Sequence, residues 1–195
     1  MARPANFGFA NLPLRTERLH LRLCRATDAQ MLFAIHSDPK VMRYWNSPAW
    51  TAIGQARETI ERDADAFRKG EALSLGIETL GNAQLIGHCM LFNISATHRR
   101  AELGYALAPL AWGKGYMGEA LQELVAYGFA QLNLHRIEAE IDPLNAASRK
   151  TLERLGFRHE GLLRERWIVN GKSSDGAVYG LLRPDWQARG KERQN

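Results

Sequence analysis

The sequence is poor in cysteine and lacks any long apolar run. Two cysteines, Cys24 and Cys89, occur in 195 residues, and their spacing matches no metal-binding pattern, so we expect reduced, buried thiols. No stretch of about 18 apolar residues is present, which predicts that no helix crosses a membrane. The first six residues lead into no apolar segment, which predicts no secretory signal. These absences favour a cytoplasmic protein with no membrane partner.

Clusters of basic, aromatic or metal-ligating side chains are also missing. The net charge is +5, but the basic residues are scattered, with only short pairs such as Arg99-Arg100 and Arg149-Lys150. A nucleic-acid-binding face usually gathers such charges, so we predict no direct nucleic-acid partner. The six histidines are dispersed along the chain without the spacing of a metal site, so we predict no metal.

What is present indicates one globular domain. Hydrophobic residues make up 45% and charged residues 24% of the chain, close to the globular average, and the length fits a single domain. We place this domain at residues 14–186, with loose termini at 1–13 and 187–195.

The periodicity of apolar residues predicts a mixed sheet. Period-two segments indicate strands and period-3.6 segments indicate helices, in the order strand, two helices, three strands, long helix, strand, short helix, two strands. The strand–helix–strand unit in the middle should be parallel and right-handed. The flanking hairpins should be antiparallel, with the strongest turn signal at Asn170-Gly171. The sequence therefore predicts an α/β (α+β) fold.

A glycine-rich segment lies between a predicted strand and the long helix. Residues 112–118 read Trp-Gly-Lys-Gly-Tyr-Met-Gly. Glycines let the backbone approach a ligand closely, and the free N–H groups and dipole of a helix N-terminus favour an anion such as a phosphate. Lys114 adds a positive charge beside them. We predict a phosphate-binding loop.

Gly113, Gly115 and Gly118 also match the dinucleotide-binding pattern, with Glu138 about 20 residues further on. The context fits less well, because residues 109–112 separate the strand from the first glycine, whereas the dinucleotide turn is tight. The strand is not a continuous apolar run, and too little chain follows to repeat the strand–helix units of that fold. Nicotinamide or flavin binding, and glycines that serve only a turn, are the weaker alternatives.

Segments around the loop resemble the acetyl-CoA site of the GCN5-related N-acetyltransferases (GNAT). They are Glu102-Leu103-Gly104-Tyr105-Ala106-Leu107, Trp112-Gly113-Lys114-Gly115-Tyr116 and Glu119-Ala120. Residues 134–139, 142–148 and 155–157, the segment Arg15-Thr16-Glu17-Arg18-Leu19 and the hairpin after Glu160-Gly161 are similar to the RimJ/RimL-like branch, which acetylates ribosomal protein N-termini. The resemblance spans residues 14–186. It implies a GNAT fold: a mixed central sheet of about seven strands with four helices, and a splayed parallel strand pair at the cofactor site.

The resemblance also implies acetyl-CoA as cosubstrate. Backbone N–H groups of the glycine loop would hold its diphosphate, and its pantetheine arm would pair with the preceding strand. Met117 stands where the family usually has a small residue, and Trp112 where it often has Arg or Gln. The implied cofactor-binding residues are Leu107, Ala108, Trp112, Gly113, Lys114, Gly115, Tyr116, Met117, Gly118, Asn145 and Ser148.

Acetylation of an amine needs a base for the amine proton, a donor to the oxyanion and an acid for the departing thiolate. Glu102 opens the strand that would carry the pantetheine and is our first candidate base; Glu165 is the second, and a merely solvated carboxylate is the alternative. Leu152 stands where many family members have a tyrosine acid, so the resemblance assigns the acid to Ser148. The alternative for Ser148 is a helix cap shared with Asn145. A backbone N–H near Leu107 is the implied oxyanion donor.

We therefore expect an acetyl-CoA-dependent N-acetyltransferase that acts on a primary amine, foremost a ribosomal or other protein N-terminus, by direct attack on the thioester. Trp45 and Trp50, in the loop between the first two helices, are expected to line the acceptor site. A small amine such as a polyamine or an antibiotic is the alternative acceptor, and a coenzyme A sensor without turnover is the alternative class. Monomer and homodimer stay open.

Overall fold

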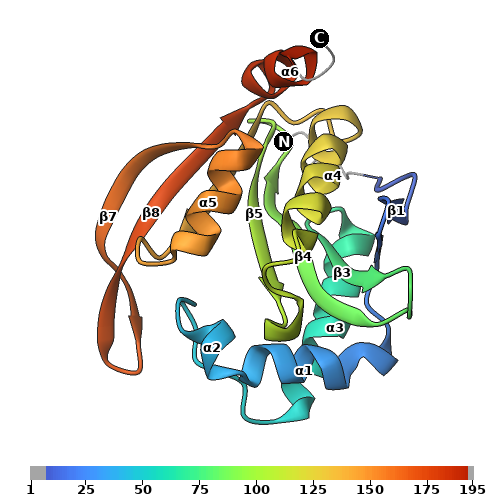
Figure 1. The fold of residues 1–195 in the computed structure, drawn as a ribbon, viewed down its shortest axis with the longest axis vertical. Coiled ribbons are helices and arrows are strands. Elements are labelled where there is room, and N and C mark those ends of the chain that lie inside the picture. Colours follow the sequence, from blue (N-terminus) through green and yellow to red (C-terminus); the bar gives the residue numbers. More distant parts are fainter. Residues whose placement is uncertain (1–7, 193–195) are drawn as a thin grey trace.

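The computed structural model describes residues 8–192. Its eight strands form one sheet in the order β1-β2-β3-β4-β5-β6-β8-β7 (Figure 1). All neighbours are antiparallel except the pair β5 and β6. The strands are β1 (Leu14–Arg15), β2 (Leu19–Arg22), β3 (Leu73–Thr79), β4 (Leu85–Ser95), β5 (Arg100–Leu107), β6 (Arg136–Ile141), β7 (Arg158–Val169) and β8 (Lys172–Leu182).

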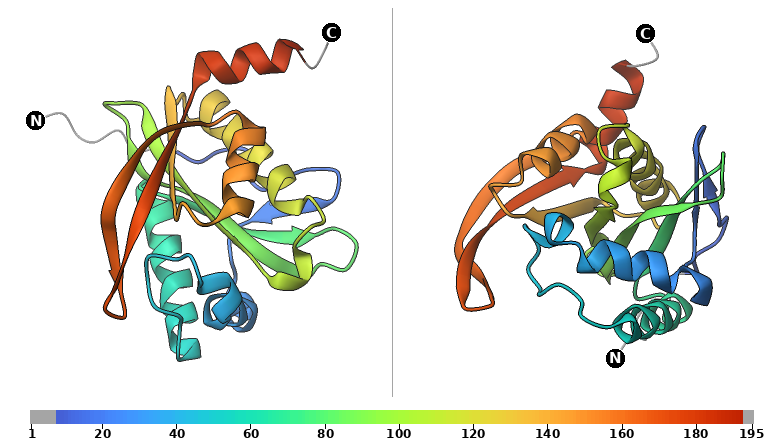
Figure 2. Two further views of the ribbon diagram at one scale, coloured as in Figure 1. Left: turned by 60° about the vertical axis from the view of Figure 1, so that its left-hand side comes forward. Right: turned by 60° about the horizontal axis from the view of Figure 1, so that its bottom comes forward.

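Helices cover both faces of the sheet. In Figures 1 and 2, α4 and α5 lie on one face and α1, α2 and α3 on the other, while the hairpin of β7 and β8 arches away from the body. The α-helices are α1 (Ala29–Ser37), α2 (Pro39–Met42), α3 (Ile53–Lys69), α4 (Tyr116–Ala130), α5 (Ala146–Leu155) and α6 (Arg183–Glu192); two 3-10 turns cover Ala26–Asp28 and Pro109–Ala111.

The parallel pair of strands separates along its length. β5 and β6 are paired only where Arg100, Ala101 and Glu102 face Arg136, Ile137 and Glu138. Beyond this point the two strands no longer pair with each other: β5 continues to Leu107 paired only with β4, and β6 continues to Ile141 paired only with β8. The predicted mixed α/β sheet with a splayed parallel pair is therefore confirmed.

The alternation along β5 divides its side chains between the two faces. Ala101, Leu103 and Leu107 are buried in the main core with the apolar stripe of α4, which includes Leu121 and Leu124. Ala106 instead packs against α1 and α2. By the same period of two, Tyr105 shares the α4 face and Glu102 the opposite face. The side chains of Glu102 and Tyr105 therefore lie on opposite faces of the sheet near the splay.

The described residues extend the fold beyond its predicted size. They form eight strands and six α-helices, where the family resemblance implied about seven and four. The polar end expected to be loose from residue 187 continues as α6 to Glu192, and at the other end Phe9 stacks on Phe67 with ring centroids 5.2 Å apart. Phe9 is ordered by its packing on Phe67, and the polar residues after 186 continue as a helix to Glu192. Residues 1–7 and 193–195 of the predicted loose ends lie outside the described part.

Two predicted absences can be examined in the described part of the chain. Within residues 8–192, no helix is long and apolar enough to cross a membrane. The same residues contain no group of three or more His, Cys, Asp or Glu arranged to hold a metal ion. Cys89 is buried and Cys24 is half-buried, and both are free thiols. Burial raises the pKa of Cys24 to about 12, so this thiol stays protonated.

Candidate active site

The glycine loop leads directly into the first turn of α4. Gly113 and Gly115 both have positive φ, +73° and +78°, a conformation that side chains disfavour. Gly115 is the N-cap of α4, and the first turn closes when the Glu119 N–H donates to the Gly115 carbonyl at 3.2 Å. At a helix start, the N–H groups of the first turn lack partners within the helix. Those of Tyr116 to Gly118 therefore point outward from the loop.

Gly115→Glu is expected to abolish stabilisation by acetyl-CoA. The substitution places a strained backbone and a carboxylate where the ligand's diphosphate would lie. For the unaltered chain, a ligand at 100 times its Kd raises the free energy of unfolding by about 2.7 kcal/mol. Thermal unfolding in the presence of acetyl-CoA, of NADH or of buffer alone measures this stabilisation in both proteins. Gly171→Glu is the matched control, since Gly171 also has positive φ, +75°, but in the open turn between β7 and β8. A persisting shift in Gly115→Glu would remove the loop from the site.

A hollow of about 560 Å³ opens beside the loop. Its walls include Arg18, Lys114 and Tyr116 together with the turn between β3 and β4. Glu102 and Tyr105 do not line it. The hollow therefore borders the glycine loop on the side of the N-terminal strands and is separate from the gap between β5 and β6.

Backbone groups near the end of β5 are already engaged. The indole Nε1–H of Trp112 donates to the Leu107 carbonyl at 2.8 Å, and the Ala108 N–H donates to the Ile86 carbonyl at 2.8 Å. A pantetheine amide can reach the Leu107 carbonyl only in competition with the Trp112 side chain, which is 46% exposed. Met117 packs against the main core, which explains a large side chain at this position.

Glu102 lies at the last paired position before the splay. It is half-buried and accepts a hydrogen bond from Asn93 Nδ2 at 3.0 Å. Glu165, the second candidate base, lies in an irregular part of β7 with φ +50°, and its N–H donates to Asp175 Oδ1 at 2.8 Å. In the sheet order, β6 and β8 stand between β5 and β7. The fold thus places Glu102, but not Glu165, beside the parted strands.

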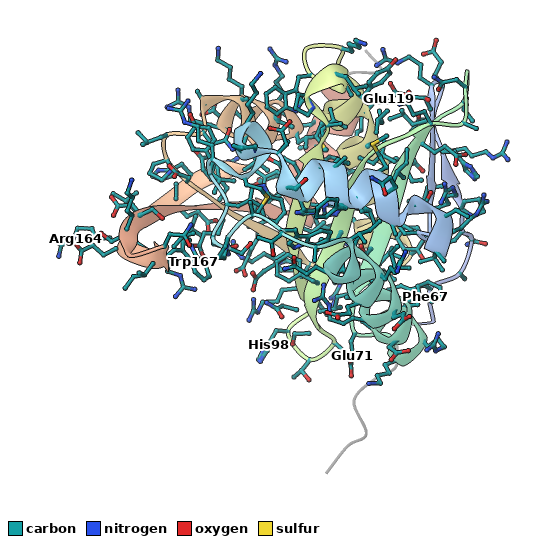
Figure 3. The ribbon with its side chains drawn as sticks, turned by 90° about the horizontal axis from the view of Figure 1, so that it is seen from below. Phe67, Glu71, His98, Glu119, Arg164 and Trp167 are labelled. Carbon is teal, nitrogen blue, oxygen red and sulfur yellow. The ribbon has the colours of Figure 1, made fainter. Side chains whose placement is uncertain are left out.

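Trp167 fastens the far hairpin to β6. Its Nε1–H donates to Glu140 Oε1 at 2.6 Å, and Arg166 approaches the same carboxylate at 3.4 Å. In Figure 3, Trp167 is turned toward the body of the molecule, whereas Arg164 points away at the outer end of the hairpin. These contacts therefore hold the inner surface of the β7–β8 hairpin against β6, at a residue beyond the point where β5 and β6 part.

Ser148 does not cap its helix; instead it joins Tyr105. The cap of α5 is the side chain of Asn145, whose Oδ1 accepts the Ser148 N–H at 3.1 Å. The Ser148 hydroxyl is 2.6 Å from the Tyr105 hydroxyl, and either can be the donor. Burial raises the pKa of Tyr105 to about 12, so the phenol keeps its proton. The pair therefore keeps a proton on the α4 face of β5 beside the splay, and Asn145 is a structural cap in this geometry.

Sequence reasoning missed Tyr105 as a site residue. The available signal was its register: it shares a face with Leu103 and Leu107 on the strand expected to carry the pantetheine. What the sequence did not show was that α5 brings Ser148 to it. Leu152, in the register where many family members have a tyrosine, is fully buried in the core.

Trp45 and Trp50 surround a buried histidine pair, which sequence reasoning also missed. His36 Nε2 and His88 Nε2 are 2.8 Å apart. The His36 ring stacks on Trp50 at a centroid distance of 4.3 Å and meets Trp45 edge-on at 5.0 Å. The two tryptophans are half-buried and fix the loop between α2 and α3 against β4. They therefore have a packing role, and their place at the acceptor site stays a prediction.

The histidine pair is expected to make the fold acid-sensitive. Burial lowers the pKa of His36 to about 3 and of His88 to about 4, from an ordinary 6.5. Between about pH 6 and 4 the unfolded chain binds protons that the folded chain excludes, so stability falls as pH falls, by roughly 1 kcal/mol per pH unit for each imidazole. Urea unfolding at a series of pH values measures this slope.

A double variant, His36→Leu with His88→Leu, tests the assignment. It replaces both partners of a buried hydrogen bond by apolar groups, which is nearly neutral at pH 7, and its stability should depend less on pH. His98→Gln, at an exposed histidine labelled in Figure 3, should keep the full slope. Equal slopes in all three proteins would contradict the assignment to this pair.

Comparison with known proteins shows the family to which the chain belongs. The sequence profile of the "Acetyltransferase (GNAT) domain" family matches residues 18–158. The chain is 40% identical over 173 residues to the uncharacterised N-acetyltransferase p20 of Bacillus licheniformis, covering 89% of this chain and 97% of that protein. It is 29% identical over 191 residues to the [ribosomal protein uS5]-alanine N-acetyltransferase of Escherichia coli, covering 92% and 97%.

Among solved structures, the spermidine N-acetyltransferase of Vibrio cholerae in complex with CoA and spermine superimposes with a TM-score of 0.78 at 25% identity, covering 88% of this chain and 99% of that one. The matching family profile and these relatives show that the chain belongs to the GNAT family of acetyltransferases, and the splayed strands and the glycine loop fit that family. It is an N-acetyltransferase that uses acetyl-CoA.

Proposed function

We propose that this enzyme acetylates the N-terminal α-amine of a protein. The primary amine attacks the thioester of acetyl-CoA directly. The observation that carries the proposal is the splay itself. Glu102 lies at its base on one face and the Tyr105–Ser148 pair on the other, with the glycine loop beyond the end of β5. Proton acceptor, proton donor and anion-binding loop therefore lie around one gap in the sheet.

In the proposed reaction, acetyl-CoA supplies the acetyl group as a thioester. Backbone N–H groups of the loop from Gly113 to Gly118 hold the diphosphate. Glu102 receives the amine proton, directly or through water, as the amine nitrogen bonds to the carbonyl carbon. A backbone N–H near Leu107 stabilises the oxyanion. As the carbon–sulfur bond breaks, the Tyr105–Ser148 pair gives its proton to the departing sulfur.

The charges around Glu102 favour an acceptor with one positive charge. Its neighbour across the strands, Glu138, is paired with Arg100 at 2.8 Å and with Arg136 at 2.7 Å. Within residues 8–192, Glu102 makes no ion pair, and its one side-chain hydrogen bond comes from an uncharged amide, that of Asn93. A polyamine needs several free carboxylates, whereas an N-terminal amine needs one. The E. coli relative that modifies ribosomal protein uS5 supports the same choice.

Spermidine acetylation is the second candidate, because the solved spermidine N-acetyltransferase of Vibrio cholerae has this fold over nearly its whole chain. An acceptor screen separates the two. Release of the coenzyme A thiol is followed with peptides that begin with a free α-amine, with the same peptides blocked at the N-terminus but carrying lysine, and with spermidine. Faster turnover of the free N-terminal peptides supports the proposal. Preference for spermidine or lysine overturns it, and no thiol release with any acceptor leaves a coenzyme A sensor.

A further inference from the structure

The N-terminal strands are fastened to the first turn of α4 by a set of three side chains, Thr16, Arg18 and Glu119, which we call the N-terminal clasp. Arg18 Nε donates to Glu119 Oε2 at 2.6 Å, and the Arg18 backbone N–H donates to Glu119 Oε1 at 3.0 Å. The Thr16 hydroxyl donates to the same oxygen. Figure 3 shows Glu119 on the side of α4 that faces the N-terminal strands. Both carboxylate oxygens are thus occupied.

Arg18 also contacts Lys114 and Tyr116 of the glycine loop and lies beside Gly115 between them. Its Nη1 donates to the Lys114 carbonyl at 3.0 Å. Its Nη2 lies 3.5 Å from the position that a Cβ on Gly115 would take, and its guanidinium lies over the Tyr116 ring, 4.8 Å from the centroid. Because Arg18 holds the Lys114 carbonyl, the peptide plane that follows Lys114 is fixed. We expect this to keep the next N–H groups of the loop turned toward the bound diphosphate.

The negative charge of Glu119 explains why a cation, Arg18, lies beside it. A carboxylate in the first turn of a helix suits the helix dipole, but it also repels an anion bound at the same turn. Burial alone would raise the pKa of Glu119, yet hydrogen bonds from Thr16 and Arg18 hold it below its ordinary value, so the group is ionised. The guanidinium of Arg18 offsets this charge and still leaves the loop N–H groups free.

We propose that the N-terminal clasp sets the glycine loop in the conformation that binds the diphosphate of coenzyme A, with Arg18 and Glu119 as positioning residues. The inference rests on the proposed role of the loop from Gly113 to Gly118. It gives a task to the segment Arg15-Thr16-Glu17-Arg18-Leu19, which the reaction itself does not use.

Arg18→Ala is the first test, with two acyl donors. Acetyl-CoA carries the diphosphate, and S-acetylpantetheine carries the same thioester without it. We expect the KM for acetyl-CoA and the Kd of coenzyme A, measured by calorimetry, to rise about 10-fold, the equivalent of one lost charged hydrogen bond. The kcat should stay constant, as should kcat/KM for S-acetylpantetheine. Arg15→Ala, at an exposed arginine in β1 that makes no side-chain hydrogen bond or ion pair within residues 8–192, should leave all of these values unchanged.

Glu119→Ala gives a test of sign. If charge alone mattered, or if Arg18 bound phosphate directly, removing this carboxylate would tighten the binding of a multiply charged anion. The clasp instead predicts weaker binding, because Arg18 and the loop lose their anchor. Tighter binding in Glu119→Ala, unchanged binding in Arg18→Ala, or an equal loss with both acyl donors would each overturn the inference. Failure of the unaltered protein to bind coenzyme A would refute the proposed function of the loop instead.

Discussion

Glu102→Gln is expected to lower kcat by about 10²–10⁴-fold, the usual contribution of a general base. The amide keeps the shape of the side chain and its hydrogen bond with Asn93, so the fold and the affinity for coenzyme A should change little. The loss should shrink as pH rises, because more of the amine is then neutral without help. Steady-state kinetics across pH, with calorimetric Kd values for coenzyme A, measure both effects.

The matched control is Glu71→Gln. Glu71 is exposed after the end of α3 and is labelled in Figure 3, away from Glu119 and the loop. Its kcat should equal that of the unaltered enzyme. If Glu102→Gln also retains full kcat at neutral pH while chemistry limits the rate, the amine proton leaves by water or by Glu165.

Removing the proton donor is expected to have the second largest effect. Tyr105→Phe deletes the half-buried phenol, and Ser148→Ala deletes its partner; each should lower kcat by about 10²-fold, the lower end of general acid catalysis. Neither change touches the α5 cap, because Asn145 provides that contact. Stability should therefore fall by no more than about 1–2 kcal/mol, the cost of a lost hydrogen bond, as a urea denaturation curve can show.

A thioester with a more acidic leaving thiol separates chemistry from positioning. Such a substrate needs less protonation, so both variants should recover most of their rate on it. Equal slowing on both thioesters would indicate that the pair positions coenzyme A. Full activity of Tyr105→Phe together with loss in Ser148→Ala would assign the proton to the serine alone.

The order of elements and the glycine loop could be predicted because they depend on local patterns. Alternation, helical period, Gly70 and Gly156 at helix ends, and Asn170-Gly171 at the last hairpin each act within a few residues. Both helix-end glycines have the left-handed conformation that such a stop uses. The glycine loop by itself indicated a phosphate ligand, and acetyl-CoA followed from the family resemblance of the segments around it.

The contacts within the site could not be predicted in the same way, because they join distant residues. Tyr105 and Ser148 are 43 residues apart, and Arg18 and Glu119 are 101 apart. Each member alone looked ordinary: a tyrosine in a strand, a serine in a helix, a glutamate in a first turn. Their partners are decided by the packing of α4 and α5 on the sheet, and local sequence does not specify that packing.

The parting of β5 and β6 also bears on how the protein avoids aggregation. Unpaired strand edges invite pairing with other chains, and most proteins shield them at the rim of the sheet. Here two such edges lie in the middle of the sheet and near α5, which carries Ser148 to β5. Strands pair at a spacing of about 4.8 Å, so an extended chain or ligand arm must enter the gap between β5 and β6 to reach these edges. These edges are therefore protected by their position inside the sheet, between β4 and β8, rather than by charges or bulges at its rim.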